Sequence, residues 1–178
     1  MTLSIILDLV LKSYMFKKLP ETGDKMTGIE GFFEFVHVEN GGAGYGMLSG
    51  KRFLLIFVSI FVLAIYIAYY VIDVKKNKNK TSFLLSISLG LISGGCIGNL
   101  VDRIFLGKVR DFINLQFMTF PVFNIADICL TIGVILAIIY FIFIYPRMEK
   151  KRLQELKDNE SSPAVSVSLP DEDQKDKK

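Results

Sequence analysis

The chain of 178 residues contains apolar runs of the length that a lipid bilayer requires. The clearest covers residues 53–74 and is nearly uncharged, and a second covers 83–105. Crossing the hydrocarbon layer takes about 20 helical residues, and backbone groups in that layer must hydrogen-bond within the protein. These runs predict membrane-spanning helices and an all-α polytopic membrane protein.

Two further apolar runs complete a four-span prediction. We expect transmembrane helices at about 2–16, 53–74, 83–105 and 121–145, the last beginning at Pro121 because proline suits the first helical turn. Hydrophobic residues make up 51% of the chain, and charge is concentrated between the runs and at the C-terminal end. The sequence therefore predicts a membrane domain over 1–148 and a disordered cytoplasmic tail over 149–178.

The longest polar connection separates the first two predicted helices. Its aromatic and β-branched stretch, followed by a glycine-rich segment, predicts a small extramembrane β element over about 29–48. The single histidine, His37, is interpreted as an exposed strand residue there.

Lysine and arginine density predicts the orientation of the chain. The two dense basic clusters are Lys75–Lys80 and Arg147–Arg152. A four-span chain places both clusters on one side, which the positive-inside rule makes cytoplasmic. Both termini are then expected in the cytoplasm, with the polar ends of the third and fourth helices toward the outer face.

Six polar residues gather where the third and fourth helices meet their connection. Charged and amide side chains at membrane depth are costly and mark functional candidates. The six polar residues in this region are Asn99, Asp102, Arg103, Asp111, Asn124 and Asp127.

Asp111 and Asp127 form a candidate pair of catalytic carboxylates. When two carboxyl groups lie close together, the pKa of one is raised, which leaves one base and one acid near neutral pH. Such a pair can activate water against an amide carbonyl and protonate the leaving nitrogen. Asn99, Asn124 and Arg103 would orient the carboxylates or the substrate. Helix capping or pairing with arginine is the alternative role for each aspartate.

Asp102 is assigned a structural role, because the adjacent Arg103 can stabilise it locally. Asp8 and Lys12 are four residues apart and can pair on one helix face. Gly90, Gly94 and Gly98 repeat every four residues, a spacing that lets another helix approach closely.

Composition disfavours several other chemistries. One histidine and two cysteines, Cys96 and Cys129, argue against a metal site, so we expect no metal or cofactor and two buried thiols. The sequence contains neither G-x-S-x-G nor H-E-x-x-H. A net charge of +3 without a basic helix gives no support for nucleic-acid binding.

In five ordered motifs the chain resembles the lipoprotein signal peptidases, the type II signal peptidases of bacteria. The motifs are D-x-x-x-K at Asp8 and Lys12, N-x-G-A at Asn40–Ala43, N-x-x-D-R at Asn99–Arg103, V-x-D-F at Val109–Phe112 and F-N-x-A-D at Phe123–Asp127. Together they cover residues 8 to about 145.

The resemblance implies an aspartic endopeptidase of the bacterial inner membrane. It would cut diacylglyceryl-modified prolipoproteins before the lipidated cysteine, act as a monomer without metal, and be inhibited by globomycin. Asp111 and Asp127 would be catalytic. The supporting positions near the site would be Asn99, Arg103, Asn124, Asn40, Gly95, Asp8 and Lys12.

Two other classes of membrane protein are alternatives to this family. A transporter or proton relay could also place carboxylates and a lysine within the membrane, but the chain shows no inverted repeat. Intramembrane proteases of the presenilin or prepilin-peptidase kind place an aspartate in a G-x-G-D block, which does not occur in this sequence.

Overall fold

The computed structural model describes residues 1–42, 47–76 and 82–161, in two compact units, Met1–Tyr140 and Phe141–Lys178. Three segments lie outside the described residues: 43–46, 77–81 and 162–178. The second of them contains most of the predicted basic cluster at 75–80. The elements of the first unit are α1 (Thr2–Lys18), β1 (Lys25–Ile29), β2 (Phe33–Asn40), α2 (Arg52–Lys76), α3 (Phe83–Phe105), β3 (Val109–Leu115) and α4 (Ile125–Ile139).

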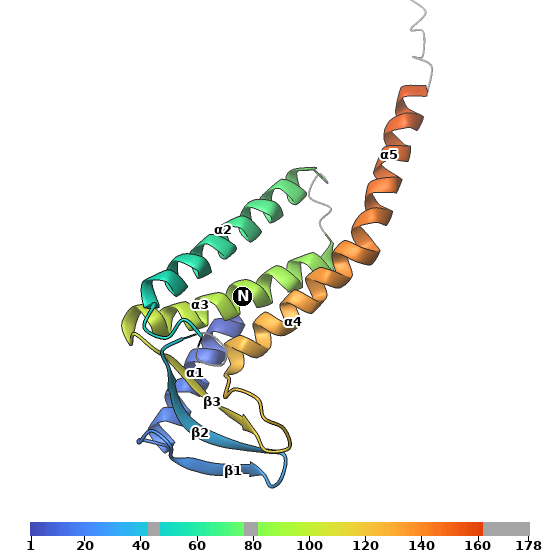
Figure 1. Ribbon diagram of the computed structural model, residues 1–178. Coiled ribbons are helices and arrows are strands. Elements are labelled where there is room, and N and C mark those ends of the chain that lie inside the picture. Colours follow the sequence, from blue (N-terminus) through green and yellow to red (C-terminus); the bar gives the residue numbers. More distant parts are fainter. Residues whose placement is uncertain (43–46, 77–81, 162–178) are drawn as a thin grey trace, which may run out of the picture. The chain divides into compact units, whose positions relative to one another are not determined.

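Helix α3 is the central helix of the first unit, and it contacts α1, α2 and α4 (Figure 1). Its glycine row faces α1, which confirms the predicted close approach. A Cβ on Gly94 would overlap the side chain of Ser4, and a Cβ on Gly98 would meet Asp8. The facing pairs are Met1 with Gly90, Ser4 with Gly94, and Asp8 with Gly98. Because both members of the pairs rise together in number, α1 and α3 run parallel.

The strands form one antiparallel sheet in the order β1–β2–β3 (Figure 1). The predicted β element between the first two helices was therefore incomplete, because its third strand comes from the connection between α3 and α4. That strand pairs with β2 across a long sequence separation, with Asp111 opposite Val38. Its own sequence, VRDFINL, is too short and too irregular in polarity to predict this pairing.

The start of α4 also differs from the prediction. The helix begins at Ile125 rather than at Pro121, with Asn124 as its N-cap. The preceding Phe123 is held in an extended conformation by backbone hydrogen bonds in both directions with Ile113 of β3. As a result Asp127 lies in the first turn of α4, whereas a helix beginning at Pro121 would place it nearly two turns from the helix start.

Three helices are long and apolar enough to cross a membrane, as judged by length and composition over the described residues. They cover Arg52–Lys75, Phe83–Phe105 and Ile125–Asp158. The predicted first span, α1, has 17 residues, which at 1.5 Å per residue is slightly shorter than a hydrocarbon layer of about 30 Å. The fold is thus mostly helical, with a small sheet.

His37 was wrongly predicted to be exposed. It is only 7% exposed, its ring centroid lies 3.9 Å from that of Phe16, and its Nδ1 lies 2.6 Å from the carbonyl oxygen of Leu19. The pairing of β2 with β3 shifts register between Phe35 and Val38. This irregularity buries two consecutive residues, Val36 and His37, which strict strand alternation does not allow.

In the second unit the chain is helical where the sequence predicts disorder from residue 149. A π-helical turn over Tyr140–Ile144 leads into α5, Tyr145–Ser161. Between Pro146 and Ser161 there is no further proline and no glycine, and the residues include several glutamates, lysines and leucines. These residue types have high intrinsic helix propensity, which explains the helix.

Candidate active site

The two candidate carboxylates come from different kinds of secondary structure. Asp111 lies in β3 and is 2% exposed, whereas Asp127 is partly buried in the first turn of α4. One amide side chain lies between them. Asn124 Nδ2 donates to Asp111 Oδ1 at 2.6 Å, and Asn124 Oδ1 accepts from the backbone N–H of Asp127 at 3.0 Å. The fold therefore brings together the predicted pair, sixteen positions apart in sequence (127 − 111).

Asp127 is also part of a reciprocal helix cap. Its Oδ2 accepts from the backbone N–H of Asn124 at 3.1 Å, which completes a capping box at the start of α4. Helix capping, considered above as an alternative, is thus correct for Asp127. The cap places this carboxylate at the positive end of the helix dipole.

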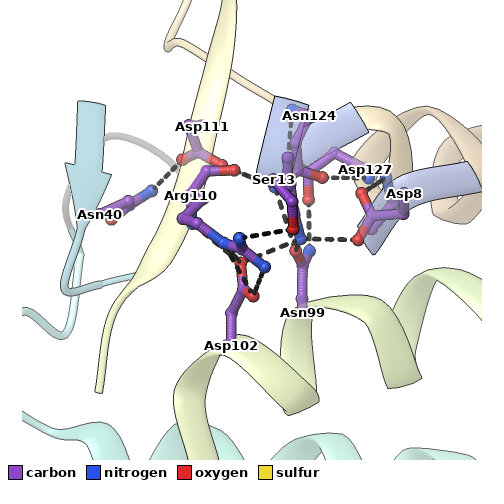
Figure 2. A network of polar contacts seen from close by, with 11 residues as sticks. Asp8, Ser13, Asn40, Asn99, Asp102, Arg110, Asp111, Asn124 and Asp127 are labelled. Atoms are coloured by element: carbon purple, nitrogen blue, oxygen red, sulfur yellow. Dashed lines mark hydrogen bonds and ion pairs between the residues drawn. The ribbon is translucent and has the colours of Figure 1, made fainter. Parts of the chain in front are cut away.

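Two more amides support the pair. Asn99 of α3 donates through Nδ2 to Asp127 Oδ1 at 2.8 Å, and Asn40 of β2 donates through Nδ2 to Asp111 Oδ2 at 2.9 Å. Each aspartate therefore has its own amide donor, and Asn124 connects the two (Figure 2).

The pKa of Asp111 is raised to about 7. Burial of the carboxyl group is the largest cause, and the nearby charge of Asp127 is the second. The hydrogen bonds from Asn40 and Asn124 act in the opposite direction but do not outweigh burial. Asp111 is therefore able to hold a proton near neutral pH.

Both aspartates open onto a cavity of about 220 Å³. Apolar residues form much of its wall, and the polar groups converge at one side. It is lined by Asn40, Asn99, Arg103, Val109, Asp111, Phe120, Pro121, Val122, Phe123 and Asp127. An apolar cavity with a few convergent polar groups is the usual form of a binding site. A second, more open cavity meets it at Asn40, Asp111, Pro121 and Val122.

Arg103 reaches this cavity from α3. Its Nη2 donates to the carbonyl oxygen of Gly42 at 3.1 Å. Asp102, the residue beside it, interacts with Arg103 electrostatically, but its ion pairs in the described structure are with Lys12 and Arg110. Successive helical residues point in different directions around the helix axis, so Asp102 and Arg103 meet different partners.

Asp102 instead pairs with Arg110 of β3, which the sequence analysis did not single out. Arg110 Nη2 lies 2.8 Å from Asp102 Oδ1, and the backbone N–H of Arg110 donates to Asp102 Oδ2 at 3.0 Å. A role for Arg110 could have been found only by knowing that residues 109–115 form a strand beside α3. The structural role predicted for Asp102 is consistent with this pairing.

The predicted pair Asp8 and Lys12 is present and fully buried, with Lys12 Nζ 2.7 Å from Asp8 Oδ2. Asp8 Oδ1 accepts from the backbone N–H of Ala126 at 2.8 Å, so α1 helps to fix the start of α4 (Figure 2). Gly95 has a related role, because a Cβ there would overlap the carbonyl oxygen of Ala126. These residues surround the site without lining its cavity.

No group of three potential metal ligands occurs among the described residues. Cys96 and Cys129 are free thiols, and both are half-buried rather than buried as predicted. The chemistry within the described part of the chain is thus that of two carboxyl groups, three amides and one guanidinium around a cavity.

The family model described as "Signal peptidase (SPase) II" matches residues 1–143. The lipoprotein signal peptidase of Lactobacillus johnsonii is 41% identical over 142 residues, which cover 80% of this chain and 88% of the relative. That of Clostridium tetani is also 41% identical, over 143 residues, covering 79% and 88%. A solved structure described as "Bacterial membrane enzyme structure by the in meso method at 2.3 A resolution" superposes with a TM-score of 0.70. The two chains are 30% identical in sequence, and the match covers 97% of this chain and 91% of the chain in that structure.

Proposed function

The chain belongs to the signal peptidase II family, and from that premise we propose that Asp111 and Asp127 are its catalytic pair. It is an aspartic peptidase that removes the signal peptide from prolipoproteins. The transporter and the other protease classes weighed above are therefore set aside. The observation that carries the catalytic assignment is the amide of Asn124, which links both carboxyl groups beside a cavity.

In the proposed mechanism Asp127 is the base and Asp111 the acid. Asp127 takes a proton from a water molecule, and the resulting hydroxide adds to the scissile carbonyl carbon. Asp111 then gives its proton to the leaving amide nitrogen as the carbon–nitrogen bond breaks. The raised pKa of Asp111 and the hydrogen bonds that stabilise the Asp127 anion support this division of roles.

The remaining polar groups orient the reactants. Asn40 and Asn124 hold Asp111, Asn99 holds Asp127, and the guanidinium of Arg103 has further N–H groups for a substrate carbonyl. By the family resemblance, the substrate is diacylglyceryl-modified and is cut before its lipidated cysteine. Both carboxyl groups and their amide donors come from one chain, which supports a monomer as the working unit.

The rate should fall as pH rises through the pKa of the acid. We expect kcat/KM for a lipidated prolipoprotein to decline above a midpoint of about 7, because Asp111 must be protonated to serve the leaving nitrogen. The measurement is initial rate against pH with detergent-purified enzyme, with far-UV circular dichroism as a folding control. A rate constant that stays level up to about pH 9 would show that Asp111 is not the proton donor.

We also propose that α1 is a fourth membrane helix and that the site faces outward. The parallel packing of α1 against α3 supports this, because the first and third spans of a chain with alternating spans run in the same direction. Strands β1 and β2 lie between α1 and α2, and β3 lies between α3 and α4. With four alternating spans, these two connections are on the same side of the membrane, and so is the sheet. The basic clusters at 75–80 and 147–152 support a cytoplasmic location for both termini.

Single cysteines test this orientation in a background where Cys96 and Cys129 are replaced by alanine. In intact spheroplasts Thr27→Cys should react with an impermeant maleimide, whereas Lys151→Cys should react only after permeabilisation. Both positions are exposed in the structure, so steric protection does not explain a difference. Labelling of Lys151→Cys without permeabilisation would place the C-terminal end outside.

A further inference from the structure

The ammonium group of Lys12 is fully buried and contacts three oxygen atoms. It lies 2.7 Å from Asp8 Oδ2, 3.3 Å from Asp102 Oδ2 and 2.9 Å from Asn99 Oδ1. The first two contacts balance its charge. The third is different, because Asn99 is the residue that donates to Asp127.

This third contact fixes the direction of the Asn99 amide. An ammonium group has only donors, so the oxygen end of the amide must face Lys12 and the NH2 end must face Asp127. Turning the amide over would place two donors together and present an oxygen to the carboxylate. Lys12 therefore disfavours the flipped orientation of the Asn99 amide, in which the amide oxygen would face the Asp127 carboxylate and destabilise it.

The same oxygen also orients the neighbouring amide. Asn99 Oδ1 accepts from Asn124 Nδ2 at 3.1 Å, and Asn124 Nδ2 also donates to Asp111 Oδ1 at 2.6 Å. The direction of both amides between the carboxyl groups is thus consistent with a single cation, Lys12, in contact with Asn99 Oδ1.

We propose that Lys12 is a positioning residue that acts through Asn99: its ammonium holds the Asn99 amide as a donor to Asp127 and thereby keeps Asp127 the base of the pair. The inference rests on the proposed roles of Asp111 and Asp127. Lys12 lies behind Asn99 and is absent from the cavity wall, so it is not itself a catalytic residue.

A simple charge effect is distinguishable from this role. The buried charges around Lys12 are Asp8 on α1, Asp102 on α3 and Arg110 on β3, which with Lys12 make two cations and two anions. Asp111 and Arg103 both interact electrostatically with Asp127, and Lys12 acts on Asp111, whose pKa it lowers. The direct charge effect of Lys12 therefore falls on the acid of the pair, whereas the proposed contact through Asn99 acts on the base. Arg110 belongs to the same balanced cluster as Lys12 but makes no hydrogen bond to Asn99 in the described structure. Arg110→Gln is therefore a matched control, since it removes one positive charge and leaves the Asn99 contact.

The test is the pH dependence of kcat/KM for a lipidated prolipoprotein, whose acidic limb reports ionisation of the base. Lys12→Met should move that limb upward by about 1 pH unit, a loss of about tenfold on the acidic side. Asn99→Ala should move it by a similar amount. The double variant should move it no further than either single variant, because the two residues act as a unit. Arg110→Gln should leave the limb in place.

An unmoved limb in Lys12→Met, or shifts that add in the double variant, would overturn the proposal. If Lys12→Met does not fold, the result for Asn99→Ala is used instead. An acidic limb that stays in place in Asn99→Ala would show that the Asn99 donor does not affect Asp127, which would also overturn the proposal. Failure of the proposed function looks different, because it would appear as turnover by Asp127→Asn or Asp111→Asn.

Discussion

Asp111→Asn and Asp127→Asn should each reduce the cleavage of lipidated prolipoprotein by at least ~100-fold, the low end for loss of acid–base catalysis. Asparagine is nearly the same size, and its single amide oxygen can still accept one of the two hydrogen bonds that each carboxylate receives. It cannot take up or deliver the proton. The double variant should be hardly slower than either single variant, because the two groups act on one reaction.

Asp102→Asn is the matched control for these variants. It makes the same chemical change close to the site, but Asp102 bonds to Arg110 and Lys12 and does not line the cavity. We expect it to lower thermal stability, because it weakens a buried ion pair, while folded molecules keep substantial activity. All variants should be compared at equal amounts of folded, detergent-purified protein, with a chelator present. Full turnover by either dyad variant would end the aspartic mechanism.

Gly95→Ala should cause the second large loss, although Gly95 contacts no substrate in the proposed mechanism. A Cβ at this position would overlap the backbone oxygen of Ala126 and lie 2.7 Å from Leu130 Cγ. Backbone cannot rotate away as a side chain can, so the start of α4 must move from α3. Overpacking of this kind costs about 1–3 kcal/mol. Because Asn99 and Asp127 lie on the two separated helices, a shift of about 1 Å is expected to reduce activity by ~100-fold.

The control is Gly90→Ala on the same helix. Among the described residues its Cβ would meet the backbone nitrogen of Met1 at 3.2 Å, a milder approach than the overlap at Gly95. Thermal unfolding and specific activity of the folded fraction should be measured for both variants. Equal specific activity of Gly95→Ala and Gly90→Ala would show that the close approach of α3 and α4 does not position the site.

The sequence by itself determined the features that depend on residue type and short spacing. Apolar run length identified α2, α3 and the helix that carries Asp127, because length and polarity are local properties. Helical spacing was enough to predict the ion pair of Asp8 with Lys12. It was also enough to predict the glycine seam. The selection of Asp111 and Asp127 came from the cost of carboxylates beside apolar helices and from the family motifs.

Only the tertiary structure decided which groups share the site and how they are oriented. The strand at 109–115 exists because it pairs with β2, which lies about seventy to eighty residues earlier in the chain. Backbone hydrogen bonds between Ile113 of this strand and Phe123 delay the start of α4 to Ile125. The partner of Asp102 proved to be Arg110 rather than its chain neighbour. The contact of Lys12 with Asn99 spans 87 positions. Such contacts depend on how helices and strands pack, and no local pattern of residues encodes which side chains then meet.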